Sequence, residues 1–185
     1  FPSRARKSTP SPSMGEGRGG GEGDGGFDAV IGNPPYIRVQ TLTEWAPLEV
    51  EAYKTLYRSA SKGNYDIYVV FVEKGLSLLN QTGRLGFILP HKFFNAQYGE
   101  PLRGLISKAK HLAEVVHFGH QQVFAGASTY TCLMLLDRAG RGSFRFVKVG
   151  DLDQWRRAGA AEEGELSAER VNSGDSFCRP ADPPP

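Results

Sequence analysis

Cysteine and long apolar runs are both scarce in this sequence. Its two cysteines, Cys132 and Cys178, lie in unlike contexts, which predicts neither a disulfide framework nor a zinc site. No apolar run approaches the ~18 residues that a membrane-spanning helix needs, and the first residues form no signal-peptide core. We therefore expect no membrane association and a reducing, cytoplasmic location.

Apolar residues are also scarce at both ends of the chain. Residues 1–26 are rich in Pro and Ser and then in Gly, and residues 151–185 are acidic and rich in Ala, Gly and Pro. Such segments cannot bury enough apolar surface to fold, so we predict both to be disordered. One folded domain is then expected over residues 27–150, where 14 basic and 9 acidic side chains give a net charge of +5. This mildly basic domain is compatible with a phosphate backbone as partner.

The chain is organised around residues 27–36, FDAVIGNPPY. The apolar run Ala29–Ile31 is typical of a buried strand, and a strand cannot continue through Pro34 and Pro35, which lack an N–H donor. The residue before a proline is held extended, which restricts Asn33. We therefore predict a rigid loop at the carboxyl end of a strand, where open α/β sheets place their ligands.

The groups in this loop suit a planar, amine-bearing ligand. The side-chain oxygen of Asn33 and the carbonyl of Pro34 can both accept hydrogen bonds from an NH2 group, and Tyr36 can stack on the ring that carries it. The alternative is a proline-stiffened surface turn without a ligand.

The remaining sequence alternates helix and strand patterns. We predict helices over residues 47–56, 67–79 (with Asp66 as N-cap) and 97–110, and strands over residues 84–90, 112–118, 129–136 and 143–149. Residues 119–127 are expected to form a loop. Such alternation indicates an α/β fold with a mostly parallel sheet, and the last two strands are expected to add an antiparallel edge pair.

FDAVIGNPPYIR resembles the catalytic motif of S-adenosylmethionine-dependent amino-methyltransferases. NYDIYVVFVEKGLSLL, GRLGFILPHKFF and VVHFGHQQVFAGASTYTCLMLL follow it in the order seen in adenine-specific DNA methyltransferases of the TaqI-like and Eco57I-like restriction–modification type. The resemblance covers roughly residues 27–138. It implies part of a Rossmann-like methyltransferase fold, S-adenosylmethionine as cofactor and double-stranded DNA as partner.

The resemblance also implies roles for individual residues. Asn33 and Pro34 would bind the N6 amine of an adenine swung out of the duplex, for direct transfer of the methyl group. Tyr36 and Phe124 would stack on the two faces of the base. Core packing is the alternative for Phe124.

Two further sets of residues follow from the same resemblance. The cofactor would contact Asn33, Pro35 and Phe71, although simple core packing explains Phe71 equally well. An insert near the DNA supplies candidate phosphate contacts, for which ordinary solvated cations are the alternative: Arg38, Lys54, Arg58 and Lys62. His117 and His120 have no companion ligands at metal spacing, so we predict no metal site.

In the resembled family, the Gly-rich turn and the acidic residue that bind the cofactor precede the NPPY motif. Because nothing foldable is expected before Phe27, we predict that the chain corresponds to the C-terminal half of a catalytic domain. Its sheet would then expose an edge and a face, and a complementary chain would supply the cofactor-binding strands. The alternatives are a non-catalytic DNA-binding or partner-docking remnant, or a protein-glutamine N5-methyltransferase, which shares NPPY.

Overall fold

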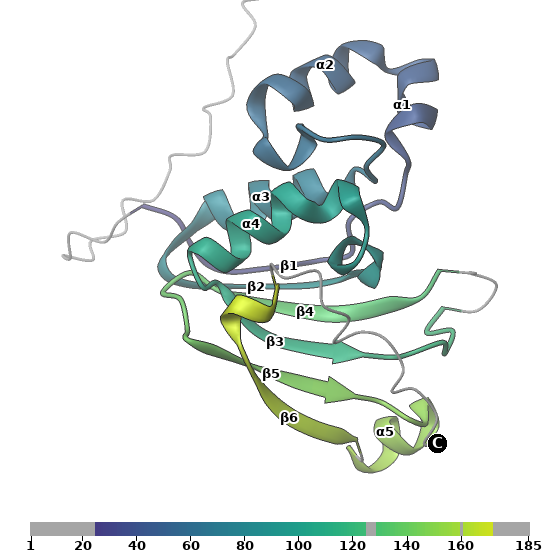
Figure 1. The fold of residues 1–185 in the computed structure, drawn as a ribbon, viewed down its shortest axis with the longest axis vertical. Helices are drawn as coiled ribbons and strands as arrows, with labels where there is room; N and C mark the ends of the chain where they lie inside the picture. The colour runs from purple at the N-terminus through teal and green to yellow at the C-terminus, as the bar shows by residue number, and fades with distance from the viewer. Residues whose placement is uncertain (1–24, 125–128, 160, 172–185) are drawn as a thin grey trace, which may run out of the picture.

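The computed structural model describes residues 25–124, 129–159 and 161–171. Six strands form one sheet in the order β1-β2-β4-β3-β5-β6, with helices packed on it (Figure 1). The strands are β1 (Phe27–Gly32), β2 (Leu79–Pro90), β3 (Leu112–His117), β4 (Thr131–Asp137), β5 (Ser143–Lys148) and β6 (Glu162–Ser167).

Four of these six strands run in the same direction. β1 and β2 are parallel, as are β3 and β5, whereas β4 is antiparallel to both of its neighbours, β2 and β3. β6 is antiparallel to β5 and forms one edge of the sheet. The predicted α/β class, mostly parallel with an antiparallel edge, is thus confirmed.

The predicted edge pair, however, is wrong. The strand expected over residues 129–136 does not pair with its successor but lies inside the sheet, between β2 and β3. Its side chains are buried on both faces at most positions, which is typical of a strand with two neighbours. The antiparallel edge is provided instead by β6, which the sequence did not predict.

The three predicted helices are present, together with six further helical segments among the described residues. The predicted ones are α2 (Pro47–Leu56), α3 (Tyr68–Leu78) and α4 (Glu100–Lys108); the others that concern the site are α1 (Val39–Trp45), η1 (Arg58–Ala60), η2 (His91–Phe94) and η3 (Gln97–Gly99). Asp66 is not the N-cap of α3: that position belongs to Ile67, and the Asp66 carboxylate accepts a hydrogen bond from the Tyr98 hydroxyl at 3.3 Å.

Helices α3 and α4 cover one face of the sheet (Figure 1). Alternate residues of β2 face them, and Leu85, Phe87 and Leu89 are buried there. The helices contribute Tyr68 and Leu102, which are fully buried in the same core. This face is closed because the alternating apolar residues of β2 pack against the apolar stripes of α3 and α4.

The β1 edge is exposed, and the face opposite α3 and α4 is covered only in part, with Val116 of β3 and Val147 of β5 buried and Leu135 of β4 left out. Ile31 is 86% exposed and Phe27 60%, and Leu135 of β4 is 37% exposed. The expectation of a buried strand at Ala29–Ile31 is therefore wrong for this chain, because β1 has a neighbour on one side only. The expectation of an exposed edge is confirmed, whereas the expected exposed face is exposed only in part.

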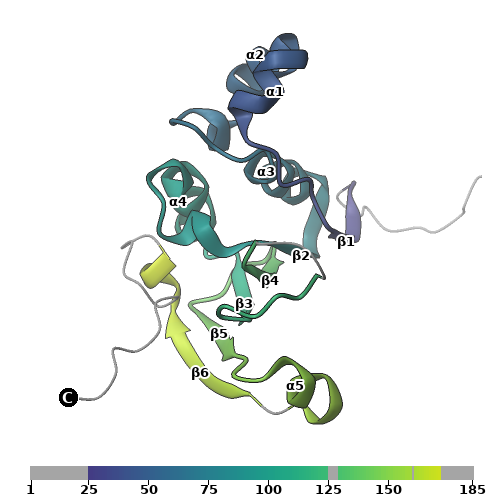
Figure 2. The same ribbon diagram turned by 90° about the vertical axis from the view of Figure 1, so that its right-hand side faces the viewer.

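The prediction of disorder from Asp151 onward is wrong for residues 151–159 and 161–171. α5 (Leu152–Ala158) begins at Asp151, whose carboxylate accepts the Gln154 N–H at 2.7 Å, and packs beside β5 and β6, with Trp155 against Phe118 at a ring distance of 5.4 Å (Figure 2). β6 is followed by η4 (Ala168–Val171). Residues 1–24 and 172–185 lie outside the described residues.

Charge complementarity explains why an acidic strand is ordered here. Arg145 of β5 forms ion pairs with Glu163 of β6 at 2.5 Å and with Glu114 of β3 at 3.2 Å. Opposite charges facing each other across antiparallel strands stabilise the pairing. Composition alone could not reveal this partner strand.

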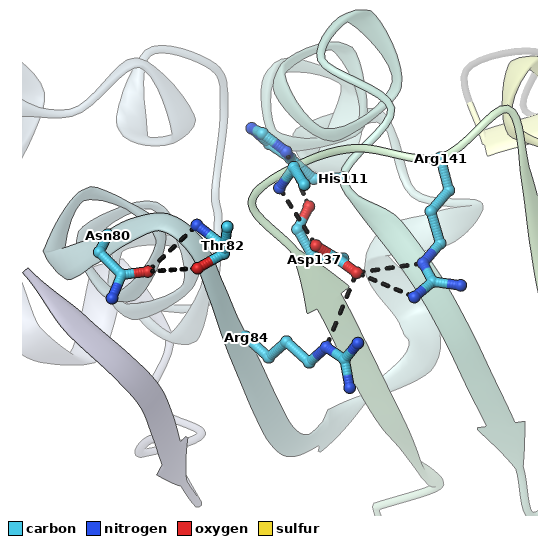
Figure 3. Close-up of polar contacts among 7 residues, drawn as sticks. Asn80, Thr82, Arg84, His111, Asp137 and Arg141 are labelled. Atoms are coloured by element: carbon cyan, nitrogen blue, oxygen red, sulfur yellow. Dashed lines mark hydrogen bonds and ion pairs between the residues drawn. The ribbon is translucent and has the colours of Figure 1, made fainter. Parts of the chain in front are cut away.

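A cluster of polar contacts around Asp137 closes one end of the sheet (Figure 3). The buried Asp137 carboxylate accepts the Ala139 N–H at 3.1 Å and the Arg141 Nε–H at 3.1 Å, and lies 3.7 Å from Arg84 Nε. His111 Nδ1 lies 3.1 Å from the Asp137 carbonyl oxygen. At this end, which we call the Asp137 end, the carboxylate is thus fully engaged.

Candidate functional site

The other end of the sheet, where the parallel strands finish, carries the candidate site. β1 ends at Gly32, β2 at Pro90 and β3 at His117, and β4 begins beside them, with Thr131 paired to Pro90. The NPPY loop therefore follows the carboxyl end of a strand as predicted. Ligands of open α/β sheets bind at this end.

A cavity of about 660 Å³ opens beside Tyr36, and we call it the Tyr36 cavity. Its wall is built from the NPPY loop, the segment after β2 and the residues before β4. The lining residues are Tyr36, Arg38, Asp66, Pro90, His91, Lys92, Asn95, Ala96, Thr129 and Tyr130. The volume lies within the range of small-molecule sites in proteins.

Two contacts orient the Tyr36 ring in this wall. Its hydroxyl donates a hydrogen bond to the Ile88 carbonyl oxygen at 3.0 Å, and its ring meets Tyr68 edge to face at 6.3 Å. Burial raises the pKa of Tyr36 to about 12, so the phenol stays protonated and keeps this donor. The ring is thus held in place while part of its surface faces the cavity.

The first three residues of the NPPY motif lie before the cavity wall rather than in it. Pro34 is buried, Pro35 is half-buried and Asn33 is exposed. Within residues 25–124, 129–159 and 161–171, no hydrogen bond engages the Asn33 amide. The proline pair is thus anchored while the amide is left available, an arrangement suited to binding rather than to holding the fold.

Phe124 lies in the loop after β3 and is 38% exposed. It is not sealed in the core, which contradicts the core-packing alternative, but it does not line the Tyr36 cavity. The structure therefore does not bring Phe124 and Tyr36 together in one wall. The loop continues into residues 125–128, which the structure does not describe.

Phe71 is 39% exposed on α3, so the core-packing alternative fails for it as well. It is absent from the lining of the Tyr36 cavity. An exposed aromatic ring on a helix that is otherwise mostly buried is available for a ligand or for another chain segment.

The four candidate phosphate contacts do not form one surface. Arg38 lines the Tyr36 cavity, whereas Arg58 lines a separate cavity of about 890 Å³ that includes residues of α3 and α4. Lys54 pairs with Glu51 at 2.8 Å, and Lys62 pairs with Glu100. Only Arg38 is therefore placed beside the predicted base-binding residue.

Sequence reasoning missed the segment after β2, which forms much of the cavity wall. Arg103 of α4 holds it: the guanidinium Nη1 donates to the Phe93 carbonyl at 2.6 Å and to the Ala96 carbonyl at 2.8 Å. Buried Phe93 and Phe94 anchor the same turn. The only sequence signal was the proline that ends β2.

The structure also joins two histidines that the sequence did not connect. His117 Nε2 lies 2.7 Å from His91 Nδ1 in the cavity wall, and the Gly119 N–H donates to His117 Nδ1 at 3.0 Å. Burial, together with neighbouring His91, His120 and Lys148, lowers the pKa of His117 to about 4. In the described part of the chain, no three His, Cys, Asp or Glu side chains gather as metal ligands.

The sheet and helices form an α/β fold that is also found in solved structures of other proteins. The fold is shared with a Listeria monocytogenes protein described as a class I S-adenosylmethionine-dependent methyltransferase, at a TM-score of 0.55 and 17% identity over 71% of this chain and 39% of that one. It is shared also with the type IIL restriction-modification enzyme MmeI, solved in complex with DNA, at a TM-score of 0.56 and 14% identity over 74% of this chain and 18% of MmeI.

Sequence similarity then identifies the family. The chain belongs to the Eco57I restriction-modification methylase family, whose model matches residues 5–124. It is 38% identical over 129 residues to the type II restriction enzyme and methyltransferase RM.Eco57I of Escherichia coli. That match covers 70% of this chain and 13% of the relative's length. The predicted resemblance to Eco57I-like enzymes is confirmed.

Proposed function

We propose that this chain is the amine-binding part of a DNA methyltransferase that transfers a methyl group from S-adenosylmethionine to N6 of adenine. The observation that carries the proposal is the NPPY loop at the carboxyl end of β1, with an unengaged Asn33 amide and an oriented Tyr36 ring beside a cavity. Family membership supports methyl transfer. It favours neither a protein-glutamine methyltransferase nor a non-catalytic remnant.

In this proposal, the residues of the NPPY loop have separate roles in binding the amine and in stacking on the base. The Asn33 side-chain oxygen and the Pro34 carbonyl accept the two N6 hydrogens, which turns the nitrogen lone pair toward the methyl donor. Tyr36 stacks on the flipped base, because its ring is held by the Ile88 and Tyr68 contacts. Phe124, exposed on the loop after β3, is the candidate for the second face of the base. Positioning and charge stabilisation supply most of the rate, so no strong general base is needed.

S-adenosylmethionine supplies an electrophilic methyl group when it is bound. The residues of this chain that fit it are Asn33, Pro35 and Phe71: the exposed ring of Phe71 can pack against the cofactor's adenine, and the backbone at Pro35 is rigid. These three residues would supply only part of a cofactor site.

A complementary set of strands completes the cofactor site in this proposal. Ile31 and Phe27 on the edge strand, and Leu135 on the adjacent face, are large apolar side chains left in solvent. An uncovered apolar edge of this kind favours pairing with another strand. The strands and helices that cover it would come from another part of the same protein or from a partner chain.

Double-stranded DNA is the partner that fits this chemistry. MmeI, which shares the fold, was solved with DNA, and Arg38 puts a guanidinium in the cavity wall for a phosphate near the flipped base. Lys54, Arg58 and Lys62 are weaker candidates, because they lie outside the lining of this cavity. No helix within the described residues has the length and apolar character to cross a membrane. We place the protein in the cytoplasm, with its DNA substrate.

The experiment is methyl transfer by this chain joined to, or complemented with, a cofactor-binding half, an assembly that we call the longer protein. Labelled S-adenosylmethionine and duplex DNA are the substrates, and Asn33→Ala is compared with Gln40→Ala, an exposed residue of α1. Loss of one oriented polar contact to the reacting group predicts a fall of about 10²–10³-fold for Asn33→Ala. Gln40→Ala should retain wild-type activity. Equal activity of the two variants would overturn the proposal.

A further inference from the structure

His91 is a polar residue of the Tyr36 cavity to which the proposed mechanism gives no role. It is the first residue after β2, and its backbone N–H donates to the Tyr130 carbonyl at 3.3 Å across to the start of β4. Its ring meets the Tyr130 ring edge to face at 6.5 Å and the His117 ring at 4.4 Å. The imidazole is thus held on two sides, unlike the long side chains of Arg38 and Lys92 in the same wall.

Hydrogen bonds determine where the protons of this histidine pair lie. The Gly119 N–H donates to His117 Nδ1 at 3.0 Å, so Nδ1 is an acceptor and the proton of neutral His117 sits on Nε2. That Nε2–H points at His91 Nδ1, 2.7 Å away, which makes Nδ1 of His91 an acceptor as well. The proton of neutral His91 is therefore on its Nε2.

Both rings are neutral at physiological pH, as this assignment requires. Burial lowers the pKa of His91, and burial together with the neighbouring His91, His120 and Lys148 lowers that of His117. Among the residues that the structure describes, no acceptor engages His91 Nε2. His91 therefore adds an oriented N–H donor to the cavity wall that Tyr36 also lines.

We propose that His91 is a specificity-determining residue whose Nε2–H donates a hydrogen bond to a ring nitrogen of the base held in the Tyr36 cavity, and that His117 is the positioning residue that fixes this tautomer. The inference rests on the proposed function, since it assumes that the cavity receives the target base.

The chemistry of adenine explains why a donor is needed there. Once both N6 hydrogens are bound by the Asn33 and Pro34 oxygens, the polar atoms left on the ring are N1, N3 and N7, and each is an acceptor. Guanine carries an exocyclic oxygen in place of the N6 amine, so the loop acceptors would be mismatched, and a His91 donor directed at N1 would meet the guanine N1–H as well. A polar site whose hydrogen bonds are left unmade rejects the wrong ligand strongly.

The tautomers are measured on the 185-residue chain, without DNA or cofactor. Nitrogen-15 NMR of the imidazoles should show both His91 and His117 protonated on Nε2. His117→Gln, which retains an N–H donor toward His91, should keep the His91 signature, whereas His117→Phe should abolish it. An Nδ1-protonated His91 in the wild type, or a signature unchanged in His117→Phe, would overturn the positioning role.

Base recognition is measured on the longer protein, with duplexes carrying 1-deaza-, 3-deaza- or 7-deazaadenine at the mapped methylation position. Losing one hydrogen bond predicts that one of the three analogues lowers kcat/KM about tenfold for the wild type. In His91→Ala, adenine itself is methylated about tenfold more slowly and the penalty for that analogue falls below about twofold. His120→Ala, an exposed neighbour, should keep the full penalty.

The outcomes separate the two proposals. If the wild type methylates adenine but no analogue is coupled to His91, this inference fails and the proposed function stands. If the wild type methylates no adenine at all, the proposed function fails, and the role of His91 in reading the base fails with it.

Discussion

The two ends of the sheet use polar side chains in opposite ways. At the Asp137 end, the carboxylate is buried and engaged by Ala139, Arg141 and Arg84. At the end with the Tyr36 cavity, the Asn33 amide and His91 Nε2 have no protein partner within the described ranges, although the rings and prolines around them are held firmly.

This difference separates residues that stabilise the fold from residues available to a ligand. A buried polar group must be paired, because an unpaired one costs about 1–3 kcal/mol. The paired groups at the Asp137 end are therefore accounted for by their role in stabilising the fold. Oriented but unengaged groups beside a cavity of about 660 Å³ are available to a second molecule.

Removing the carboxylate at the Asp137 end should give the largest effect on stability. Asp137→Ala deletes the acceptor for the Ala139 N–H and the partner of two arginines, both of which are half-exposed or more and regain water. We expect a loss of about 2–3 kcal/mol in the free energy of unfolding, measured with urea. Asp28→Ala, which removes one exposed bond to Asn80, is the control and should cost less than about 0.5 kcal/mol. A loss in Asp137→Ala no larger than that of the control would break the comparison.

Changes at Tyr36 should affect activity. Tyr36→Ala removes the stacking ring, worth about 1–3 kcal/mol per base, so methyl transfer by the longer protein should fall about 10–100-fold. Tyr36→Phe keeps the ring and loses only the bond to the Ile88 carbonyl, so it should retain activity within about fivefold. Similar losses in both variants would show that the hydroxyl, not the ring, is what matters at this position.

The histidine pair predicts a pH dependence of stability. His117 takes up a proton at about pH 4 in the folded chain and at 6.5 otherwise, so the unfolded state binds more protons between these values. The free energy of unfolding should therefore be highest above pH 6.5 and fall by about 3 kcal/mol toward pH 4. His117→Gln should flatten part of this slope in urea titrations at several pH values. Wild-type stability that stays constant from pH 7 to pH 4.5 would contradict the assignment.

The smallest expected effect concerns DNA affinity. Arg38→Ala removes a guanidinium from the cavity wall, and we expect about three- to tenfold weaker binding and a shallower salt dependence. Lys54→Ala is the matched control, since its ammonium pairs with Glu51 on an exposed helix, and it should change affinity less than about twofold. Fluorescence anisotropy on a labelled duplex at two salt concentrations measures both. The reverse order would place the DNA over α2 instead.

The sequence predicted those parts of the fold whose signals are local. The prolines marked the loop after β1, and the apolar periodicity marked α2, α3 and α4 within a few residues. α5 and β6 were missed because their order depends on distant partners: Trp155 packs on Phe118, and Glu163 pairs with Arg145. A composition rule that treats each segment alone cannot detect such contacts.

The candidate site was likewise predicted only where its signals are local. The identity of the NPPY residues could be read from their chemistry, but the cavity wall could not. His91 and Tyr130 meet there because β2 and β4 are neighbours, although they are far apart in the sequence. Predicting the wall would have required knowing that β4 lies inside the sheet, and the sequence placed it at the edge.

The central claim is that the oriented groups beside the Tyr36 cavity deliver an adenine N6 to the methyl donor. The most direct test is mass spectrometry of nucleosides from the genomic DNA of methylation-deficient cells that express the longer protein or its Asn33→Ala variant. The account predicts N6-methyladenine with the wild type and none with the variant. N4-methylcytosine in place of N6-methyladenine, or N6-methyladenine at equal levels with both proteins, would contradict it.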